Sequence, residues 1–525
     1  MYQDRKVWIA VSGDEKVYIY PKMANRHGMI AGATGTGKTV TLKVMAESFS
    51  ACGVPVFLAD VKGDLAGMCK SGTMNDNVKK RIDAMGLEEA GYKFDAYPTT
   101  YWDIYAEKGL PLRTTISEMG PLLLSRIMDL NDTQSDILTI CFKIADDEGL
   151  LLVDTKDLKS MLQYVAEKSK EYSLEYGNIS KQSVAAIIRA IVALESEGGD
   201  TFFGEPALNI ADWFSRDCDG KGAIQVLDCQ KLINNPTMYA TFMLWMMSEL
   251  FETLPEAGDG DKPKMVFFFD EAHLLFKDAP KALLTKIEQV VKLIRSKGVG
   301  IYFITQNPKD IPDGVLSQLG NKVQHALRAY TPTEQKAAKV AAQSFRANPE
   351  FDTYETLVSL GTGEALISVL DEEGIPTVVK KCDILPPQSQ MGPLDDAERD
   401  KVIKNDLLYV RYSQSVDRDS AYEFLKRRNL EEAQAQEKAA EEAAAAKAAE
   451  KEAADKAKAE AKEAAAKKKQ VTRAVKSVAN SAVGTIGRQL GNEIGESIGG
   501  SFGKKIGGNV GASLGRGILS TLFKS

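Results

Sequence analysis

Gly32-Ala33-Thr34-Gly35-Thr36-Gly37-Lys38-Thr39 has the spacing of a complete phosphate-binding loop. It follows the apolar pair Met29-Ile30 and precedes a run, 40–45, with the composition of a helix. In that setting the glycines let backbone N–H groups turn toward the β- and γ-phosphates, Lys38 reaches the terminal phosphates, and the Thr39 hydroxyl can bind Mg2+. A chance Gly-rich turn would seldom have this placement, so the stretch predicts nucleotide binding. The residues expected to contact the nucleotide are Gly32, Ala33, Thr34, Gly35, Thr36, Gly37, Lys38, Thr39 and Val40.

The composition is that of a soluble globular protein. The 525 residues are 44% apolar and 26% charged, which leaves room for roughly two to four domains. The net charge of −7 gives no overall preference for nucleic acid, so DNA binding would need a local surface or the interior of an assembly. The six cysteines form no Cys-x-x-Cys pair, which argues against a structural metal. Neither a signal peptide nor an apolar run of about 18 residues is evident, so we expect a cytoplasmic protein.

Alternating strands and helices predict an α/β fold with a mostly parallel sheet. Two short alternating segments, 6–11 and 16–20, indicate a hairpin before the phosphate-binding loop. Between about 110 and 215 the apolar residues recur near a helical period, which indicates a helical insertion. Further buried strands are expected at 54–60, 223–228, 265–270, 301–305 and 365–369.

These patterns divide the chain into five parts. The expected parts are 1–110, with the hairpin and the first half of the nucleotide-binding core; 111–215, the helical insertion; 216–420, the second half of the core; 421–470, a helical linker rich in Ala, Glu and Lys; and 471–525, a glycine-repeat tail.

Two acids end the apolar strand 265–270. Asp270 would hold Mg2+, usually through water, and Glu271 would orient and polarise the attacking water. The alternative is a simple acidic turn, but the phosphate-binding loop upstream favours the catalytic interpretation. Asp270-Glu271-Ala272-His273 also matches a motif of one helicase superfamily. The Arg-rich motifs that should follow it are absent, so we interpret His273 as a packed or exposed histidine. Gln306 ends the strand 301–305 and is a candidate sensor of the γ-phosphate, the alternative being a strand cap.

Two arginines are candidates for an arginine finger. Arg295 lies in the last turn of a predicted helix that Gly298 closes, where a cation is also favoured by the helix dipole alone. A finger would instead reach the γ-phosphate bound by a neighbouring subunit and stabilise charge in the transition state. Arg328 is the second candidate. Residue type alone does not decide between them.

Taken together, the motifs resemble the HerA/FtsK superfamily of ring-forming motor ATPases, in particular a bacterial family of HerA-like ATPases. The resemblance covers roughly residues 1–420. It rests on residues 25–30 and the phosphate-binding loop that follows them, on Asp270-Glu271, and on residues 295–300 and 305–308. It implies a RecA-like core, a homo-hexamer or other ring, ATP as the nucleotide, Glu271 as catalytic acid/base, Gln306 as sensor and Arg295 as the likelier finger in trans. GTP is disfavoured independently, because 321–324 lacks the aspartate of a guanine-reading loop.

The sequence also departs from that superfamily. HerA-type translocases carry a β-barrel before the core, whereas here the loop starts at residue 32 and leaves room for little beyond a hairpin. FtsK-type proteins add membrane spans and a winged-helix DNA reader, and neither is evident. ATP hydrolysis is therefore expected from residues, and action on DNA as a helicase or translocase by analogy only.

The tail repeats glycine at every fourth position from Gly487 to Gly515, each glycine preceded by an apolar residue. A helix with this repeat needs close backbone packing to offset its glycines. Self-association, membrane contact through the tail and a flexible tail all remain open. The leading hypothesis is thus an ATP-hydrolysing motor with Mg2+ as cofactor, acting as a ring on nucleic acid. The alternative is an ATP-controlled assembly or membrane-associated scaffold attached through the tail.

Overall fold

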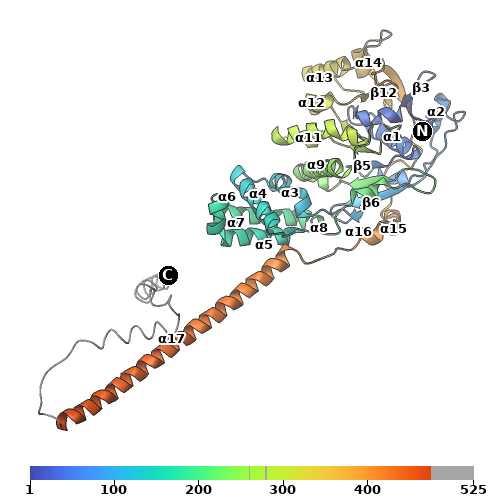
Figure 1. The fold of residues 1–525 in the computed structure, drawn as a ribbon. Helices are drawn as coiled ribbons and strands as arrows, with labels where there is room; N and C mark the ends of the chain where they lie inside the picture. Colours follow the sequence, from blue (N-terminus) through green and yellow to red (C-terminus); the bar gives the residue numbers. More distant parts are fainter. Residues whose placement is uncertain (259, 278–280, 475–525) are drawn as a thin grey trace. The chain divides into compact units, whose positions relative to one another are not determined.

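The computed structural model describes residues 1–258, 260–277 and 281–474 (Figure 1). The chain divides into two units, Met1–Leu430 and Glu431–Ser525. The glycine repeat lies outside the described residues. Among the described residues, no helix combines the length and the apolar character needed to cross a membrane.

A 13-stranded sheet forms the centre of the first unit, in the order β1-β2-β13-β12-β11-β4-β10-β9-β5-β8-β6-β7, with β3 also paired to β2. From β11 to β7 the neighbouring strands run parallel, as the alternation of strands and helices predicts. The strands are β1 (Tyr2–Gln3), β2 (Lys6–Ser12), β3 (Glu15–Ile19), β4 (Gly28–Ala31), β5 (Val56–Asp60), β6 (Thr99–Asp103), β7 (Leu110–Pro111), β8 (Ile224–Asp228), β9 (Met265–Phe269), β10 (Val299–Thr305), β11 (Asn321–His325), β12 (Glu364–Ser368) and β13 (Lys380–Ile384).

The sheet separates two apolar cores because successive strand side chains point to opposite faces. Phe267 and Phe269 of β9 belong to one core, and Phe268 between them belongs to the other. Helices α9 (Pro236–Thr253) and α11 (Lys281–Ile294) cover the first face, and α1 (Lys38–Ala51) covers the second (Figure 1). Because the central strands are buried on both faces, they fix the points from which the loops at their ends begin.

The predicted insertion is helical, and one of its helices, α3 (Ile116–Ile127), packs against α9 on the first face. Three of them begin with capping boxes, at Thr115, Asn131 and Asp154, each of which satisfies two otherwise unpaired backbone donors. The helices of the insertion are α3 (Ile116–Ile127), α4 (Asp132–Asp147), α5 (Thr155–Glu167), α6 (Ser169–Tyr176), α7 (Lys181–Leu194) and α8 (Asp200–Phe202).

The N-terminal hairpin is confirmed as β2 and β3, but it does not stand apart from the core. Asp383 of β13 pairs with Val11 of β2, so the hairpin extends the antiparallel edge β11-β12-β13-β2 of the same sheet. The other helices of this unit are α2 (Asp76–Ala84), α10 (His273–Phe276), α12 (Asp313–Leu316), α13 (Pro332–Gln343), α14 (Thr353–Ser359), α15 (Asp396–Asn405) and α16 (Tyr409–Tyr412).

The predicted helical linker is part of α17 (Ala421–Ala474). Its first turns belong to the first unit, where Leu425 is buried in the core. From Glu431 to Glu460 every side chain is exposed. A helix that is polar all round depends on intrinsic propensity and on pairs such as Lys456–Glu452, 3.1 Å apart, rather than on burial.

Candidate active site

Three neighbouring parallel strands bring the predicted site residues to one edge of the sheet. β10 lies between β4 and β9, with Thr305 in register with Ala31 and Phe303 with Phe269. The phosphate-binding loop follows β4, Asp270-Glu271 follows β9, and Gln306 follows β10. Because the carboxyl ends of parallel strands share an edge, these groups meet there.

The phosphate-binding loop has the backbone that its glycines permit. Gly32, Gly35 and Gly37 have φ of 153°, 78° and 114°, and α1 begins directly afterwards at Lys38. A Cβ on Gly32 would lie 2.5 Å from the Cβ of His325, so no larger residue fits. Lys38 Nζ donates hydrogen bonds to the carbonyl oxygens of Gly32 (2.6 Å) and Ala33 (3.0 Å). Burial lowers the pKa of Lys38, and the nearby Asp270 and Glu271 oppose that shift.

The ends of β11 and β12 hold the loop in place. Ala33 N–H donates to the carbonyl of Ala326, and Gly363 N–H donates to that of Thr36. His325 is fully buried beside the loop: its Nδ1 lies 2.9 Å from the carbonyl of Glu364 and its Nε2 lies 2.8 Å from the Thr41 hydroxyl. Burial lowers the pKa of His325 to about 4, so the ring is neutral. A carbonyl only accepts, so Nδ1 carries the proton and Nε2 accepts from Thr41. Nothing in the local sequence marks His325 as part of this site.

Asp270 and Glu271 occupy a tight turn at the end of β9. Glu271 has φ of 49°, a left-handed conformation that is strained for a residue with a side chain. Its N–H donates to Asp270 Oδ1 (2.9 Å), and the Tyr239 hydroxyl donates to the Asp270 carbonyl (2.6 Å). Burial, with the adjacent Glu271 carboxylate, raises the pKa of Asp270 to about 6. An acid with so raised a pKa has much to gain from a nearby cation.

Glu271 meets three side chains, two from other loops and one from the start of α10 directly after it. Gln306 Nε2 donates to Glu271 Oε2 at 3.4 Å, and His273 Nδ1 lies 3.3 Å from the same oxygen. Lys62, in the loop after β5, lies 3.9 Å from Oε1. Two residues that the sequence singled out separately, Glu271 and Gln306, are thus in contact. His273, interpreted from the sequence as a packed or exposed histidine, and Lys62, which the sequence did not single out, both belong to this cluster.

The two candidate arginines lie at opposite ends of the core. Arg295 precedes β10, whose seven residues span about 23 Å at roughly 3.3 Å each, so it is far from the loop of its own subunit. Arg328 follows β11 and is exposed. It lines a cavity of about 240 Å3 together with Thr36 of the phosphate-binding loop, Tyr330 and Tyr354.

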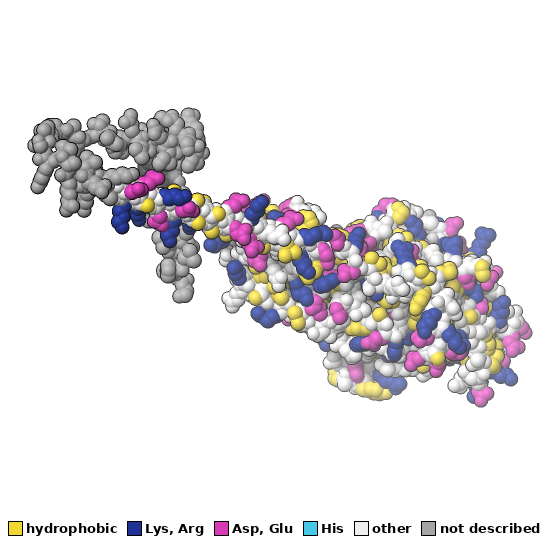
Figure 2. All heavy atoms as spheres, turned by 90° about the horizontal axis from the view of Figure 1, so that it is seen from below, with side chains coloured by type: hydrophobic (Ala, Val, Ile, Leu, Met, Phe, Trp, Pro, Cys, Tyr) yellow, Lys and Arg dark blue, Asp and Glu magenta, His cyan; other side chains and the backbone are white. Residues whose placement is uncertain are grey.

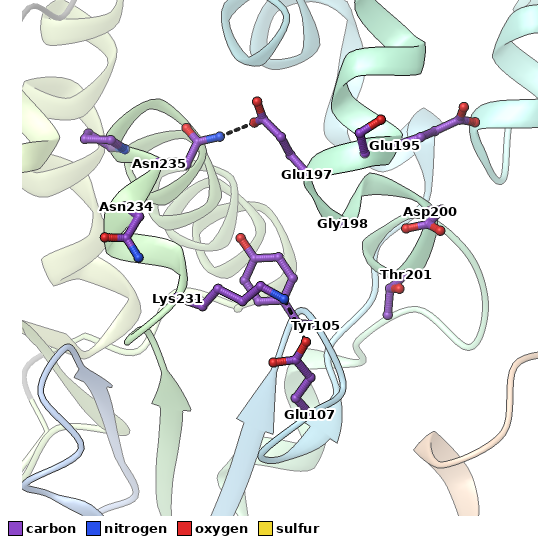
Figure 3. A pocket seen from close by; sticks show the side chains of 12 residues that line it. Tyr105, Glu107, Glu195, Glu197, Gly198, Asp200, Thr201, Lys231, Asn234 and Asn235 are labelled. Atoms are coloured by element: carbon purple, nitrogen blue, oxygen red, sulfur yellow. Dashed lines mark hydrogen bonds and ion pairs between the residues drawn. The ribbon is translucent and has the colours of Figure 1, made fainter.

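A second hollow, of about 770 Å3, lies between the insertion and the loops after β6 and β8 (Figure 3). Glu107, Glu195, Glu197 and Asp200 line it, and its Lys231 is paired with Glu107 at 2.7 Å. Its lining includes no residue of the phosphate-binding loop, and its acids would repel phosphate. The edge formed by β4, β9 and β10 therefore remains the candidate nucleotide site.

Residues 6–506 match the family model described as "Helicase HerA-like C-terminal". The chain belongs to this family. As a HerA-like P-loop ATPase it is an ATP-hydrolysing motor enzyme of the α/β class.

The HerA-like chain is also similar to individual curated proteins and solved structures. It is 22% identical over 388 residues to the DNA double-strand break repair helicase HerA of Sulfurisphaera tokodaii, covering 70% of this chain and 67% of the relative. It is 21% identical to the protein of the same description from Sulfolobus acidocaldarius, covering 72% and 69%. Among solved structures, VirB4 of Thermoanaerobacter pseudethanolicus is 15% identical, with a TM-score of 0.47 and coverage of 73% and 97%.

Proposed function

We propose that this HerA-like ATPase forms a ring that couples ATP hydrolysis to movement along DNA. The observation that carries the proposal is the contact of Glu271 with Gln306 at the strand edge that bears the phosphate-binding loop. The DNA substrate rests on the relatives, since the two HerA proteins similar to this chain are described as DNA repair helicases.

The residues at this edge suit Mg2+ bound together with a nucleotide. Mg2+ prefers hard oxygen ligands and usually keeps several waters, taking one or two protein ligands plus phosphate oxygens. Thr39 offers a hydroxyl and Asp270 a carboxylate whose pKa is raised to about 6 by burial. The described residues hold no cluster of three or more His, Cys, Asp or Glu able to form an all-protein metal cage. When bound with ATP, Mg2+ would neutralise charge that develops on the phosphates.

We assign the hydrolytic roles by position. Glu271 accepts the proton of the attacking water, whose oxygen bonds to the γ-phosphorus as the bond to the bridging oxygen breaks and ADP leaves. Gln306, whose amide donates a hydrogen bond to Glu271 Oε2, orients that water and senses the γ-phosphate. Lys38 leaves the loop carbonyls for the β- and γ-phosphates, and the backbone of 32–40 surrounds them.

The cavity beside Thr36 is the proposed site of the adenine base. Its wall includes Tyr330 and Tyr354, with Val358 and Leu360 as apolar neighbours, a lining that suits a flat aromatic ring. Arg328 in this wall then serves the nucleotide of its own subunit. Arg295 is left as the finger in trans, because it lies at the opposite end of β10. A trans finger requires a neighbour, which is the reason to propose a ring.

The DNA surface must be local. On the face shown in Figure 2, Lys and Arg side chains are interspersed with Asp and Glu rather than gathered in one basic patch. With a net charge of −7, a ring would place its DNA contacts in a lumen where several copies contribute.

The proposal is tested by measuring phosphate release with no addition, with double-stranded DNA and with liposomes, and particle size with and without ATP. Glu271→Gln protein prepared in parallel corrects for contaminating ATPases. We expect stimulation by DNA and a ring-sized particle. Stimulation by liposomes but not DNA would instead favour an ATP-controlled membrane scaffold, and full activity as a monomer would exclude a trans finger.

A further inference from the structure

One buried imidazole ties both ends of the segment that carries Arg295. His27 lies directly before the phosphate-loop strand β4 and is 2% exposed. Its Nε2 lies 2.9 Å from the carbonyl of Val291, one helical turn before Arg295 in α11. Its Nδ1 accepts from the N–H of Ile301 at 3.0 Å, in β10. The 3-10 turn Arg295–Lys297 and Gly298 lie between these two anchor points.

The chemistry of the site requires histidine. One anchor is a carbonyl, which needs a donor, and the other is an N–H, which needs an acceptor, so the ring must be neutral with its proton on Nε2. Burial lowers the pKa of His27 to about 4, which keeps it neutral at physiological pH, and the nearby Arg295 charge acts in the same direction. A phenyl ring could fill the volume but could make neither bond.

The backbone is strained to place this ring. His27 has φ of 56°, a conformation that is uncommon for a residue with a side chain. Its carbonyl is held by the backbone N–H and the side-chain amide of Asn321, both at 3.1 Å. Local strain of this kind persists only where surrounding contacts determine it.

β4 connects His27 and its two hydrogen bonds to the phosphate-binding loop. It has four residues, about 13 Å at roughly 3.3 Å per residue, with His27 before its first residue and Gly32 of the phosphate-binding loop after its last. The Arg295 turn also contacts the segment after α9. Lys297 forms an ion pair with Glu256 at 3.1 Å, and the N–H of Ala257 donates to the carbonyl of Ser296. Of these contacts, the two hydrogen bonds of His27 connect the Arg295 turn to the strand that carries the phosphate-binding loop.

We propose that His27 is a positioning residue that holds the Arg295 turn in place and ties it to the phosphate-loop strand of its own subunit. The nucleotide site of one subunit is thereby connected to the arginine that the same subunit presents to its neighbour. This inference rests on the proposed trans role of Arg295.

The test is a double-mutant cycle in the full chain, measuring ATP turnover and the affinity for a fluorescent ATP analogue. Arg295→Ala should lower kcat by ~10³-fold or more if it is a finger. His27→Phe should lower kcat by ~10- to 100-fold, since a misplacement of about 1 Å can cost that much. Nucleotide affinity should stay near wild type in both, because each subunit's own phosphate-binding loop is intact.

The decisive comparison is the double variant. If His27 acts only through Arg295, then His27→Phe/Arg295→Ala should turn over no more slowly than Arg295→Ala alone. A loss that multiplies with that of Arg295→Ala, or a His27→Phe protein with normal kcat, would overturn the inference while leaving the proposed function intact. An Arg295→Ala protein with normal kcat would instead remove the finger assignment itself.

Two further variants guard against misfolding. His27→Gln retains an amide that can donate and accept, and should recover part of the lost kcat if hydrogen bonding is what matters. Glu256→Gln removes the ion pair between Glu256 and Lys297 in the same turn but leaves both hydrogen bonds of His27, and should leave kcat near wild type. If His27→Phe does not fold, His27→Leu takes its place because it also makes neither bond: a reduced kcat with unchanged nucleotide affinity supports the inference, and a normal kcat contradicts it.

Discussion

Acids end three neighbouring strands of the sheet, β5, β8 and β9, and they differ in which groups hold them. At the end of β5, Asp60 accepts hydrogen bonds from the N–H groups of Gly63 (2.8 Å) and Leu65 (3.1 Å). At the end of β8, Asp228 faces Arg399 at 3.0 Å, with both side chains 6% exposed. On β9, the neighbour of β5, Glu271 has a strained backbone and side-chain contacts of 3.3 to 3.9 Å.

The difference shows that a strand-end acid is not functional by position alone. Asp60 and Asp228 have partners inside the fold and close their own loops. Glu271 is held at 3.3 to 3.9 Å by three side chains, Lys62 and Gln306 from other loops and His273 from the start of α10, contacts that can rearrange around a substrate. We therefore assign structure to the first group and chemistry to the second, and each assignment can be tested by substitution.

The largest effect is expected from Glu271→Gln. The amide keeps the shape but cannot take a proton from water, so kcat should fall by ~10²- to 10⁴-fold while nucleotide binding persists. Phosphate release at saturating ATP and binding of a fluorescent analogue measure the two quantities. The matched control is Asp60→Asn on the adjacent strand, whose folded fraction should turn over at a near wild-type rate. Similar losses of kcat in both variants would mean that the acids after β5 and after β9 do not differ in function.

Asp228→Asn should act on stability rather than on chemistry. It leaves the Arg399 guanidinium buried without its counter-charge, which typically costs about 3–5 kcal/mol in the free energy of unfolding. Urea unfolding gives the cost, and turnover per folded molecule should be preserved. Replacing both partners, with Asp228→Leu and Arg399→Met, should recover most of the loss. Full stability of the single variant would mean that Arg399 is satisfied in another way.

The contrast also explains what sequence could and could not predict. The phosphate-binding loop and Asp270-Glu271 are local patterns whose spacing specifies their chemistry, and the apolar strands β5, β8, β9 and β10 are evident from composition. Strands β6 (Thr99–Asp103) and β11 (Asn321–His325) were missed because they are rich in polar residues, although they are mostly buried. Their burial comes from neighbours distant in sequence. Asn321, for example, is satisfied by Met23, His27 and Leu370.

The same limit applies to the site. Lys62 and His325 reach it from other strands, and only the pairing order of the sheet brings them to Glu271 and to the phosphate-binding loop. The sequence names the residues of one continuous motif, whereas contacts between motifs follow from tertiary structure.

Asp270→Asn should stabilise the nucleotide-free protein, in a pH-dependent way. The folded-state pKa of Asp270 is about 6, above its ordinary value of 3.8, so between these values the folded state binds more protons than the unfolded state. Stability therefore falls as pH rises from about 4 to 6, by up to about 3 kcal/mol, and the cost stays constant above pH 6. The asparagine variant avoids it.

The measurement is thermal unfolding without nucleotide or Mg2+ from pH 4 to 8. The advantage of Asp270→Asn should be greatest at pH 8 and vanish near pH 4. With Mg2+ and ATP analogue present, the sign should reverse at pH 8, because only the wild-type carboxylate can contribute to Mg2+ binding. A pH-independent difference would mean that Asp270 is not ionising in this range.

The smallest effect is expected from Lys62→Met. The positive charges of Lys62 and Lys38 both act to lower the pKa of Asp270, against the larger effects of burial and Glu271. Removing Lys62 should raise that pKa further, but its side chain is 48% exposed, so solvent screening limits the change to about 1 kcal/mol or less. The stability difference between Lys62→Met and Lys62→Met/Asp270→Asn, followed against pH, should therefore level off at a slightly higher pH than in the wild-type background. Lys70→Met, which breaks a 2.7 Å pair with Glu398 instead, is the control and should not move that midpoint. A midpoint shift as large as the difference between the pKa of Asp270 and its ordinary value would mean that Lys62 is as strong a partner for the β9 acids as Arg399 is for Asp228, and the two groups of strand-end acids would no longer differ.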